Sequence, residues 1–256
     1  MMQQSLPPDQ FVLVCDGPLT EGLEDVVATL KRQCQDAYIV RLEENLGLGS
    51  ALNAGFAYCK NEFIARMDSD DLAHHNRCEK QIAYMLENNL DLCSATVSEF
   101  VGDYPDMNDS PSLVGYRSLP EKHEDLIRFA KTRNPMNHPC VMFRRSMAEK
   151  AGLYRHMPLF EDYDLWARMI LAGAKLGNHP ETLLYMRSGV DFYKRRSGFR
   201  YCRDIAHFWR EMYRVRYCSF PRSVINISIR CMISILPLKV IQYTYRKKLR
   251  GNTLKA

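Results

Sequence analysis

Three aspartates lie close together after an apolar segment: Asp68, Asp70 and Asp71 in FIARMDSDDLAHH, residues 63–75. No basic residue interrupts the cluster, and carboxylates this close repel one another unless a cation neutralises them. Carboxylate oxygens suit hard ions such as Mg²⁺ or Mn²⁺, which commonly also bind a substrate diphosphate. One aspartate could instead cap the following helix. Capping does not account for three, so the spacing predicts a divalent metal site.

A second candidate is the glycine-rich stretch NLGLGSALNAG, residues 45–55. Glycines before a helix allow its N-terminal amides to approach an anion or a ribose. The same pattern is also typical of a turn followed by a tightly packed helix. Both interpretations remain open from the sequence.

The third candidate is EDYDLW, residues 161–166. Its apolar residues recur at helical spacing and are predicted to face the core: Leu165, Trp166, Met169 and Ile170. Glu161 and Asp162 then lie in the first turn, where the helix dipole favours ionised carboxylates. An ionised, positioned carboxylate can take a proton from a sugar hydroxyl. Simple capping explains one acidic residue equally well.

The first hundred residues alternate between strand and helix, which predicts a doubly wound α/β sheet. In such sheets ligands bind beyond the carboxyl ends of the strands, where both Asp16 and Asp68 fall. The predicted strands are 11–15, 37–42, 63–67 and 92–101, and the predicted helices are 21–33, 45–60 and 77–87. Residues 102–122 are predicted to be a loop, followed by a helix at 123–132, a strand at 140–143, a helix from 161 and a strand at 182–186.

The composition is that of an ordinary globular protein: 256 residues, 46% hydrophobic and 25% charged, with a net charge of +5. Nine scattered cysteines without paired spacing indicate free thiols in a reducing compartment. The first residues do not resemble a signal peptide, and no apolar run is long enough to span a membrane. The expected location is the cytosol, and no nucleic-acid partner is expected.

The C-terminal residues 201–256 are predicted to form a helical, basic extension. Residues 223–245 are apolar with basic residues between them, and RKKLR follows. This pattern fits an interfacial helix on anionic lipids, at the cytoplasmic face of a membrane. A helix packed back on the preceding domain is the alternative.

The order of the motifs resembles the family 2 glycosyltransferases of the GT-A fold. A D-G pair follows a strand, then come the glycine-rich stretch, D-x-D-D and, about 90 residues later, E-D-x-x-L-W. The segment ARMDSDD with Arg77, Glu79, Lys80 and Gln81 looks most like bacterial exopolysaccharide and lipopolysaccharide enzymes, including amylovoran-type transferases. The resemblance implies a GT-A mixed sheet flanked by helices over residues 1–200. Family members usually begin with one more strand and helix, roughly 20–30 residues, so an N-terminally truncated domain is expected.

The resemblance also implies a role for each matching residue. It implies an inverting transfer from a UDP- or GDP-sugar to a saccharide or lipid-linked acceptor, with Mn²⁺ or Mg²⁺ as cofactor. The implied nucleotide-sugar contacts are Asp16, Asn45, Gly47, Asn53, Asp68, Arg187 and Arg195; the metal ligands are Asp70 and Asp68; the catalytic carboxylates are Asp162 and Glu161; the acceptor-side residues are His138 and Trp166.

Two other functions are compatible with the sequence. A truncated chain could be a non-catalytic binding component of a polysaccharide-assembly complex, although both Asp70 and Asp162 are present. A nucleotidyltransferase would also use an α/β sheet and paired aspartates. The acidic pair before a tryptophan-bearing helix favours the glycosyltransferase.

Overall fold

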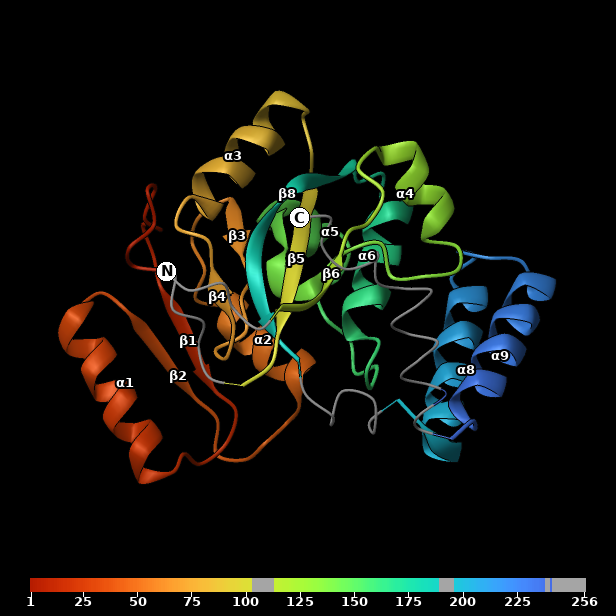
Figure 1. The fold of residues 1–256 in the computed structure, drawn as a ribbon, viewed down its shortest axis with the longest axis horizontal. Helices are drawn as coiled ribbons and strands as arrows, with labels where there is room; N and C mark the ends of the chain where they lie inside the picture. Colours follow the sequence, from red (N-terminus) through yellow and green to blue (C-terminus); the bar gives the residue numbers. More distant parts are fainter. Residues whose placement is uncertain (103–112, 189–195, 238–239, 241–256) are drawn as a thin grey trace.

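The computed structural model describes residues 1–102, 113–188, 196–237 and 240. Its first part follows the predicted alternation of strands and helices, shown in red to yellow in Figure 1. The elements are β1 (Val12–Cys15), α1 (Glu21–Gln33), β2 (Tyr38–Arg41), α2 (Leu48–Phe56), β3 (Phe63–Ala65), β4 (Leu72–Ala73), α3 (Arg77–Glu87) and β5 (Leu92–Phe100). The alternation that the sequence predicts is therefore confirmed, with the additional short strand β4.

The described strands form two sheets rather than the single sheet expected. β1 and β2 pair in parallel with each other, and a mixed sheet has the order β3-β7-β5-β8-β4 with β6 beside β5. Among the described residues, no strand pairs with the second edge of β1 or of β3. α2 connects β1 to the rest of the molecule instead, because Gly55 allows the helix backbone to lie directly against Val14.

The second half differs from the prediction in its strands. β6 (Leu113–Arg117) lies in the stretch predicted as a loop, where it pairs with the edge of β5. β8 (Leu176–Arg187) is longer than predicted because it follows β5 in parallel along its whole length. The other elements are α4 (His123–Phe129), a short 3₁₀ turn η1 (His138–Cys140), β7 (Met142–Arg144), α5 (Arg145–Lys150) and α6 (Glu161–Leu171).

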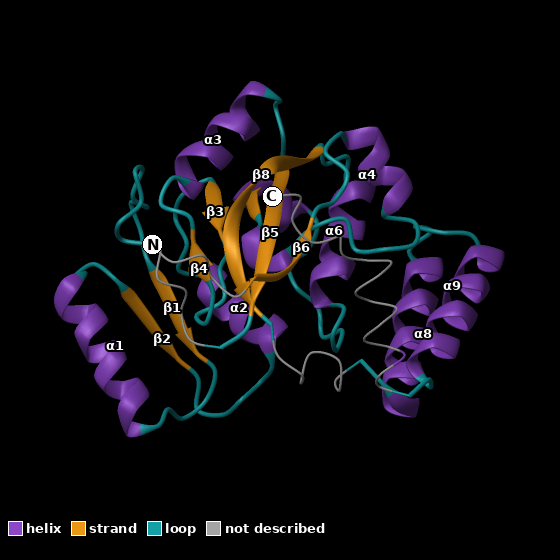
Figure 2. Ribbon diagram, viewed as in Figure 1, coloured by secondary structure: helices purple, strands orange, loops and turns teal. Residues whose placement is uncertain are grey.

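The core lies on both faces of the mixed sheet (Figure 2). On one face, Leu165 and Trp166 of α6 pack with Phe143 of β7 and Leu92 of β5. On the other face, Met85 of α3 packs with strand residues that point the opposite way. This alternation of side chains along β5 buries the sheet on both faces, as expected for a layered α/β fold.

α8 (Gly198–Arg214) and α9 (Phe220–Ser234) form a helical hairpin at the opposite end of the molecule from α1 (Figure 1). α8 buries Phe208 and Trp209 against Phe160 and Tyr163 at the start of α6. The domain boundary predicted at residue 200 thus falls inside a helix that shares a core with α6. No described helix is long and apolar enough to cross a membrane.

Candidate functional site

The acidic cluster follows β3 as predicted, and it has a basic partner that the sequence analysis did not foresee. The carboxylate oxygens of Asp68, Asp70 and Asp71 lie within 4.8 Å of one another. Arg66, which is only 7% exposed, donates to both carboxylate oxygens of Asp68, one at 3.0 Å. The expectation of an unpaired acidic cluster is therefore wrong for Asp68, because Arg66 partly balances its charge.

Asp71 is the buried member of the cluster. One of its oxygens accepts a hydrogen bond from the Arg187 backbone N–H at 2.8 Å, and the other, Oδ2, has no partner among the described residues. Burial, together with the neighbouring charges of Asp68 and Asp70, raises the pKa of Asp71 to about 7. Ionisation of Asp71 therefore costs free energy, and a nearby cation would lower that cost.

These residues fit a divalent metal ion. The exposed Asp70 and the half-buried Asp68 present carboxylate oxygens to solvent, and the orphaned oxygen of Asp71 lies beside them. An all-oxygen donor set that leaves room for water and phosphate ligands is the environment that Mg²⁺ and Mn²⁺ prefer.

The first turn of α6 carries the second acidic pair. Asp162 is 8% exposed, and it accepts hydrogen bonds from Asn134 Nδ2 at 2.5 Å and from the Tyr163 backbone N–H at 2.7 Å. Burial nevertheless raises the pKa of Asp162. Burial and the adjacent Asp162 raise the pKa of Glu161 to about 7. Burial therefore opposes the helix dipole, and the expectation that the dipole keeps both carboxylates ionised stays a prediction.

The predicted motifs converge on one place. Arg66 acts electrostatically on Asp71, on Glu161 and on Asp162, lowering the pKa of each. A Cβ on Gly49, in the first turn of α2, would lie 3.5 Å from the Glu161 Cβ. The glycine-rich stretch, the D-x-D-D cluster and the acidic pair therefore line a common region around Arg66.

The start of α2 is shaped by hydrogen bonds within its own loop. Asp16, after β1, accepts from the backbone N–H of Leu46 at 2.8 Å, and Asn45 accepts from that of Gly47 at 3.2 Å. Gly47 has φ +84°, which a side chain would strain. The backbone N–H groups of Leu46 and Gly47 are therefore engaged within the loop, and nucleotide contacts by Asp16, Asn45 and Gly47 stay predictions.

Asn53 has a structural role in the described contacts. Its side-chain amide donates to the Tyr154 carbonyl at 2.8 Å and accepts from the Tyr154 backbone N–H at 3.0 Å. This pair of hydrogen bonds fastens α2 to the segment before α6. The predicted contact between Asn53 and the nucleotide sugar receives no support from this geometry.

On the acceptor side, His138 borders the site and Trp166 does not. Nδ1 of His138 lies 3.9 Å from Asp162 Oδ2, and Nε2 lies 3.2 Å from the Tyr154 hydroxyl. Burial and the charge of Arg66 hold the pKa of His138 well below its usual value, so this contact joins a neutral imidazole to the carboxyl group. Trp166 is 0% exposed and packs beneath His138, with ring centroids 6.0 Å apart. Trp166 faces the core, as its helical spacing predicts, and its place on the acceptor side stays a prediction; it supports His138 from the core.

Two arginines, Arg187 and Arg195, were predicted to contact the nucleotide sugar. Arg187 ends β8 beside the acidic cluster, and its guanidinium donates to the Gly102 carbonyl. Its predicted contact with the diphosphate stays a prediction. Arg195 lies outside the described residues.

Sequence reasoning missed three residues of this site: Arg66, Asn134 and Tyr154. Arg66 stands two positions before Asp68 at the end of a strand, so both side chains could have been expected on the same side. Asn134 lies 28 positions before Asp162, and Tyr154 is joined to the acidic pair by a loop with no periodic pattern. No local spacing could have found them.

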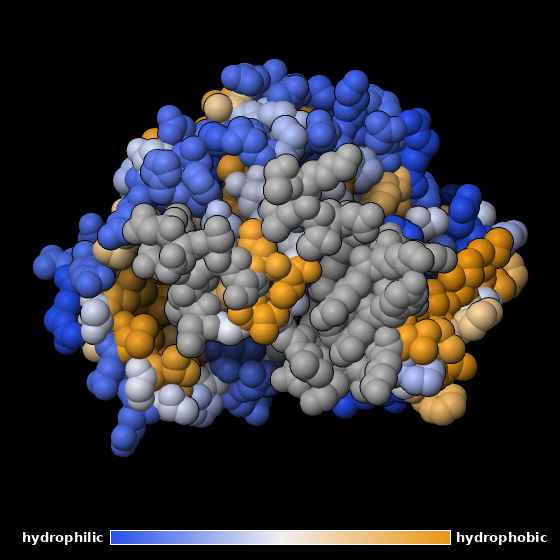
Figure 3. Space-filling model, in the orientation of Figure 1, coloured by the Kyte–Doolittle hydropathy of each residue, from blue (hydrophilic) through white to orange (hydrophobic). Residues whose placement is uncertain are grey.

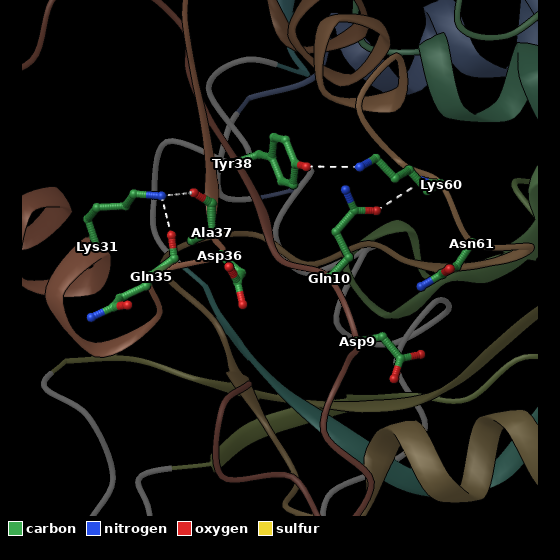
Figure 4. Close-up of a pocket in the computed structure, with 9 residues that line it drawn as sticks. All are labelled: Asp9, Gln10, Lys31, Gln35, Asp36, Ala37, Tyr38, Lys60 and Asn61. Carbon is green, nitrogen blue, oxygen red and sulfur yellow. Dashed lines mark hydrogen bonds between the residues drawn. The ribbon is translucent and has the colours of Figure 1, made fainter.

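A separate cleft lies at the N-terminal ends of β1 and β2 (Figure 4), and Asp68, Asp70 and Asp71 are not among the residues that line it. Its lysines are engaged within the protein: Lys31 Nζ donates to the Ala37 carbonyl at 2.8 Å, and Lys60 Nζ donates to the Tyr38 hydroxyl at 2.9 Å. The cleft contains no cluster of carboxylates comparable to the one after β3.

Comparison with known proteins gives a consistent result. Residues 1–152 match the model of the family described as glycosyl transferase family 2. The chain is 38% identical over 250 residues to the amylovoran biosynthesis glycosyltransferase AmsE of Erwinia amylovora, covering 97% of this chain and 91% of that protein. It is 30% identical over 249 residues to an Escherichia coli UDP-Gal:alpha-D-GlcNAc-diphosphoundecaprenol beta-1,3-galactosyltransferase, covering 97% of this chain and 88% of that protein.

Solved structures share the fold at lower sequence identity. The mannosyltransferase PcManGT of Pyrobaculum calidifontis, in complex with GDP-Man and Mn²⁺, has a TM-score of 0.58 and 13% identity over 94% of this chain and 72% of that one. S. aureus TarS 1-349 has a TM-score of 0.54 and 19% identity over 79% of this chain. The present chain spans 58% of that structure's length.

Proposed function

Because the chain belongs to glycosyl transferase family 2 and is a glycosyltransferase, we propose that it transfers a sugar from a nucleoside diphosphate to a hydroxyl group with inversion. The observation that carries this proposal is the convergence of two acidic groups around Arg66. One group, Asp68, Asp70 and Asp71, suits a metal ion and a diphosphate. The other, Glu161 and Asp162, suits proton removal from an acceptor.

In this mechanism the Asp162 carboxylate receives the proton of the acceptor hydroxyl. The acceptor oxygen forms a bond to the anomeric carbon while the bond from that carbon to the diphosphate oxygen breaks, and the electron pair leaves with the nucleoside diphosphate. The hydrogen bonds from Asn134 and from the Tyr163 backbone orient Asp162. Its raised pKa makes it a stronger base once it is deprotonated.

Glu161 and Arg66 have supporting parts in the proposal. Glu161 lies against the first turn of α2 and adds negative charge next to Asp162. Arg66 holds Asp68 in place and offsets the charge of both acidic groups. A positive charge between the groups also lowers the cost of bringing an anionic diphosphate to the site.

A divalent cation, Mn²⁺ or Mg²⁺, would be held by Asp70 and Asp68. When bound, it would supply charge stabilisation to the departing diphosphate. The donor would lie along the glycine-rich stretch with its base toward Asp16. The UDP-GlcNAc complex of TarS and the GDP-Man complex of PcManGT support a nucleotide-sugar donor of either kind.

The acceptor that we propose is a saccharide or a lipid-linked saccharide used for a bacterial surface polysaccharide. The names of the two relatives support this, since one acts in amylovoran biosynthesis and the other on a diphosphoundecaprenol-linked sugar. With such an acceptor, we propose that the protein acts at the cytoplasmic face of a membrane, in peripheral contact with lipid.

The test is a transfer assay with a panel of UDP- and GDP-sugars, Mn²⁺ and an extract of lipid-linked saccharides. We expect one donor to be consumed, with Asp70→Ala and Asp162→Asn each lowering the rate at least about a hundredfold. Glu149→Gln, an exposed change on α5, serves as the control with an unchanged rate. If Asp162→Asn retains full activity, Asp162 is not the base.

A further inference from the structure

Helix α9 is inverted relative to an ordinary surface helix. Its fully buried residues are polar, with Ser223 4% exposed and Asn226 5% exposed, while Ile227 and Cys231 are partly buried against the core. Its exposed residues are apolar: Ile225, Ile229 and Met232 are 51%, 52% and 63% exposed. A surface helix in water normally buries its apolar stripe and exposes its polar face.

Specific hydrogen bonds fix this orientation. Ser223 Oγ donates to the Trp209 carbonyl at 2.9 Å, and Asn226 Nδ2 donates to the Lys131 carbonyl at 3.0 Å. The Arg230 guanidinium donates to the Thr132 carbonyl at 2.7 Å. Rotating the helix to bury its isoleucines would break these bonds and leave buried polar groups unpaired, which is costly. The apolar residues therefore stay on the outside.

The exposed side chains form a continuous patch, which we name the α9 outer face. Figure 3 shows hydrophobic side chains gathered over this end of the molecule. The α9 outer face consists of Val224, Ile225, Ile229, Met232, Ile235 and Leu236. An apolar surface of this extent on a soluble domain normally marks an interaction site.

A basic stripe runs along the neighbouring helix α8. Its exposed arginines recur at intervals of three, four or seven residues and so share one side of the helix. They are Arg200, Arg203, Arg210 and Arg214. Phe199, at the start of α8, is 86% exposed beside them. α8 and α9 together contain two acidic residues, Asp204 and Glu211, so the hairpin carries a net positive charge.

The α9 outer face and the basic stripe each lie on the side of their helix that faces solvent. α8 contacts α6 through Phe208, and its exposed arginines lie on the opposite side. α9 contacts the segment after α4 through Asn226, and the α9 outer face lies on the opposite side. Because the two helices pack side by side on one body, their outer sides form one surface.

We propose that this surface of the α8–α9 hairpin docks on a bilayer that contains anionic lipid. Lipid covers the α9 outer face at the depth of the acyl boundary, and the arginines of α8 pair with lipid phosphates. Apolar and basic groups on one amphipathic surface are the combination that an anionic membrane interface recognises. A second copy of the chain fits less well, because it would bring another basic stripe to a surface that has little acidic charge.

The position of the hairpin connects this surface to the acidic pair. Phe160, which precedes Glu161, stacks on Phe208 of α8 with ring centroids 4.7 Å apart. Tyr163, which follows Asp162, lies 4.8 Å from the same ring. A bilayer bound at this surface would also carry the lipid-linked acceptor, an inference that rests on the proposed function. Phe208 lies on the side of α8 that faces α6, so the bilayer and the acidic pair lie on opposite sides of this helix, and a lipid-linked acceptor would extend past α8 to reach Asp162.

The experiment is flotation of the full chain with vesicles of phosphatidylcholine alone or mixed with phosphatidylglycerol at about three to one. We expect the wild type to float with the mixed vesicles. The variant Ile225→Gln/Ile229→Gln should bind these vesicles at least about tenfold more weakly. Arg203→Gln/Arg210→Gln should lose about fivefold per arginine on the mixed vesicles only. The matched control is Leu23→Gln/Val26→Gln on α1, which changes residues that are 51% and 62% exposed and should bind unchanged.

Two results would overturn the proposal. One is equal flotation of the wild type and of Ile225→Gln/Ile229→Gln. The other is a dimer in lipid-free sedimentation velocity that the same variant abolishes, which would assign the surface to a second copy. Donor binding, measured on the same samples, should be equal in wild type and variant. Loss of donor binding in all samples would refute the proposed function and leave the membrane surface standing.

Discussion

Replacing Arg66 with methionine tests the electrostatic arrangement of the site. Arg66→Met keeps the apolar stem of the side chain and removes the guanidinium group with its charge. Asp68 then loses its donor, and Glu161 and Asp162 lose a neighbouring positive charge. We expect a less stable protein in the absence of metal, and a larger loss of stability at pH 8 than at pH 5.5, where more of these carboxyl groups are protonated.

The size of the loss follows from the burial of the pair. Removing one partner of a fully buried ion pair costs about 3–5 kcal/mol, and an exposed pair is worth below about 1 kcal/mol. The side chain of Arg66 is 6% exposed and that of Asp68 is 36% exposed, so solvent screens one partner. The expected loss is therefore about 1–3 kcal/mol in the free energy of unfolding.

Urea denaturation of Arg66→Met, Asp68→Asn and the double variant, in EDTA, isolates the pair. We expect a coupling energy of about 1 kcal/mol or more. The Arg145–Glu149 pair on α5, with 33% and 47% exposure, is the control cycle and should give below about 0.5 kcal/mol. A coupling energy for Arg66 and Asp68 no larger than that of the control would refute the reasoning.

The remaining predictions concern a hydrogen-bonding residue beside the site, the pH dependence of transfer and the packing of two glycines. Asn53→Ala should lower the free energy of unfolding by about 2 kcal/mol, through two lost hydrogen bonds to Tyr154, and change donor affinity less than about twofold; a large loss of affinity with unchanged stability would make Asn53 a ligand. The transfer rate should rise with pH, because burial raises the pKa of Asp162 and its protonated form cannot accept the proton of the acceptor. Glu161→Gln should move this rise to lower pH, because it removes a neighbouring carboxylate charge; a flat profile from pH 5 to 9 would contradict this. Gly55→Ala should destabilise by about 1–3 kcal/mol, because its Cβ would lie 2.7 Å from a β1 valine, whereas Gly22→Ala, in open space on α1, should stabilise by about 0.5–1 kcal/mol in the same urea assay.

The elements of the fold's first half were predictable because hydrophobic periodicity and local turn residues determine them. The strand that ends before Asp68 and the helix that begins at Glu161 both lie where the pattern placed them. β6 was missed because its pairing with β5 decides its conformation, while its neighbours are turn formers.

The positions of the acidic groups of the site were predictable, and their charge balance was not. The types and spacing of the aspartates indicated a metal, since like charges need a cation. The raised pKa of Asp162 depends on burial by parts of the chain remote in sequence. The burial of Trp166 was predictable, because its helical spacing places it on the core side of α6.

The orientation of α9 could not have been read from its periodicity. An amphipathic pattern normally places the apolar stripe inside, and here the polar residues face the protein. Only the backbone carbonyls of Lys131, Trp209 and their neighbours, brought together by tertiary structure, explain the reversal.

Isothermal titration calorimetry of nucleotide sugars tests the central claim most directly: the aspartates after β3 hold a cation that binds the donor, and Asp162 acts on the acceptor. The account predicts that a UDP- or GDP-sugar binds wild type in Mn²⁺ and not in EDTA, that Asp70→Ala abolishes this binding, and that Asp162→Asn retains it. Binding of equal strength in EDTA, or equal binding by Asp70→Ala, would contradict the account.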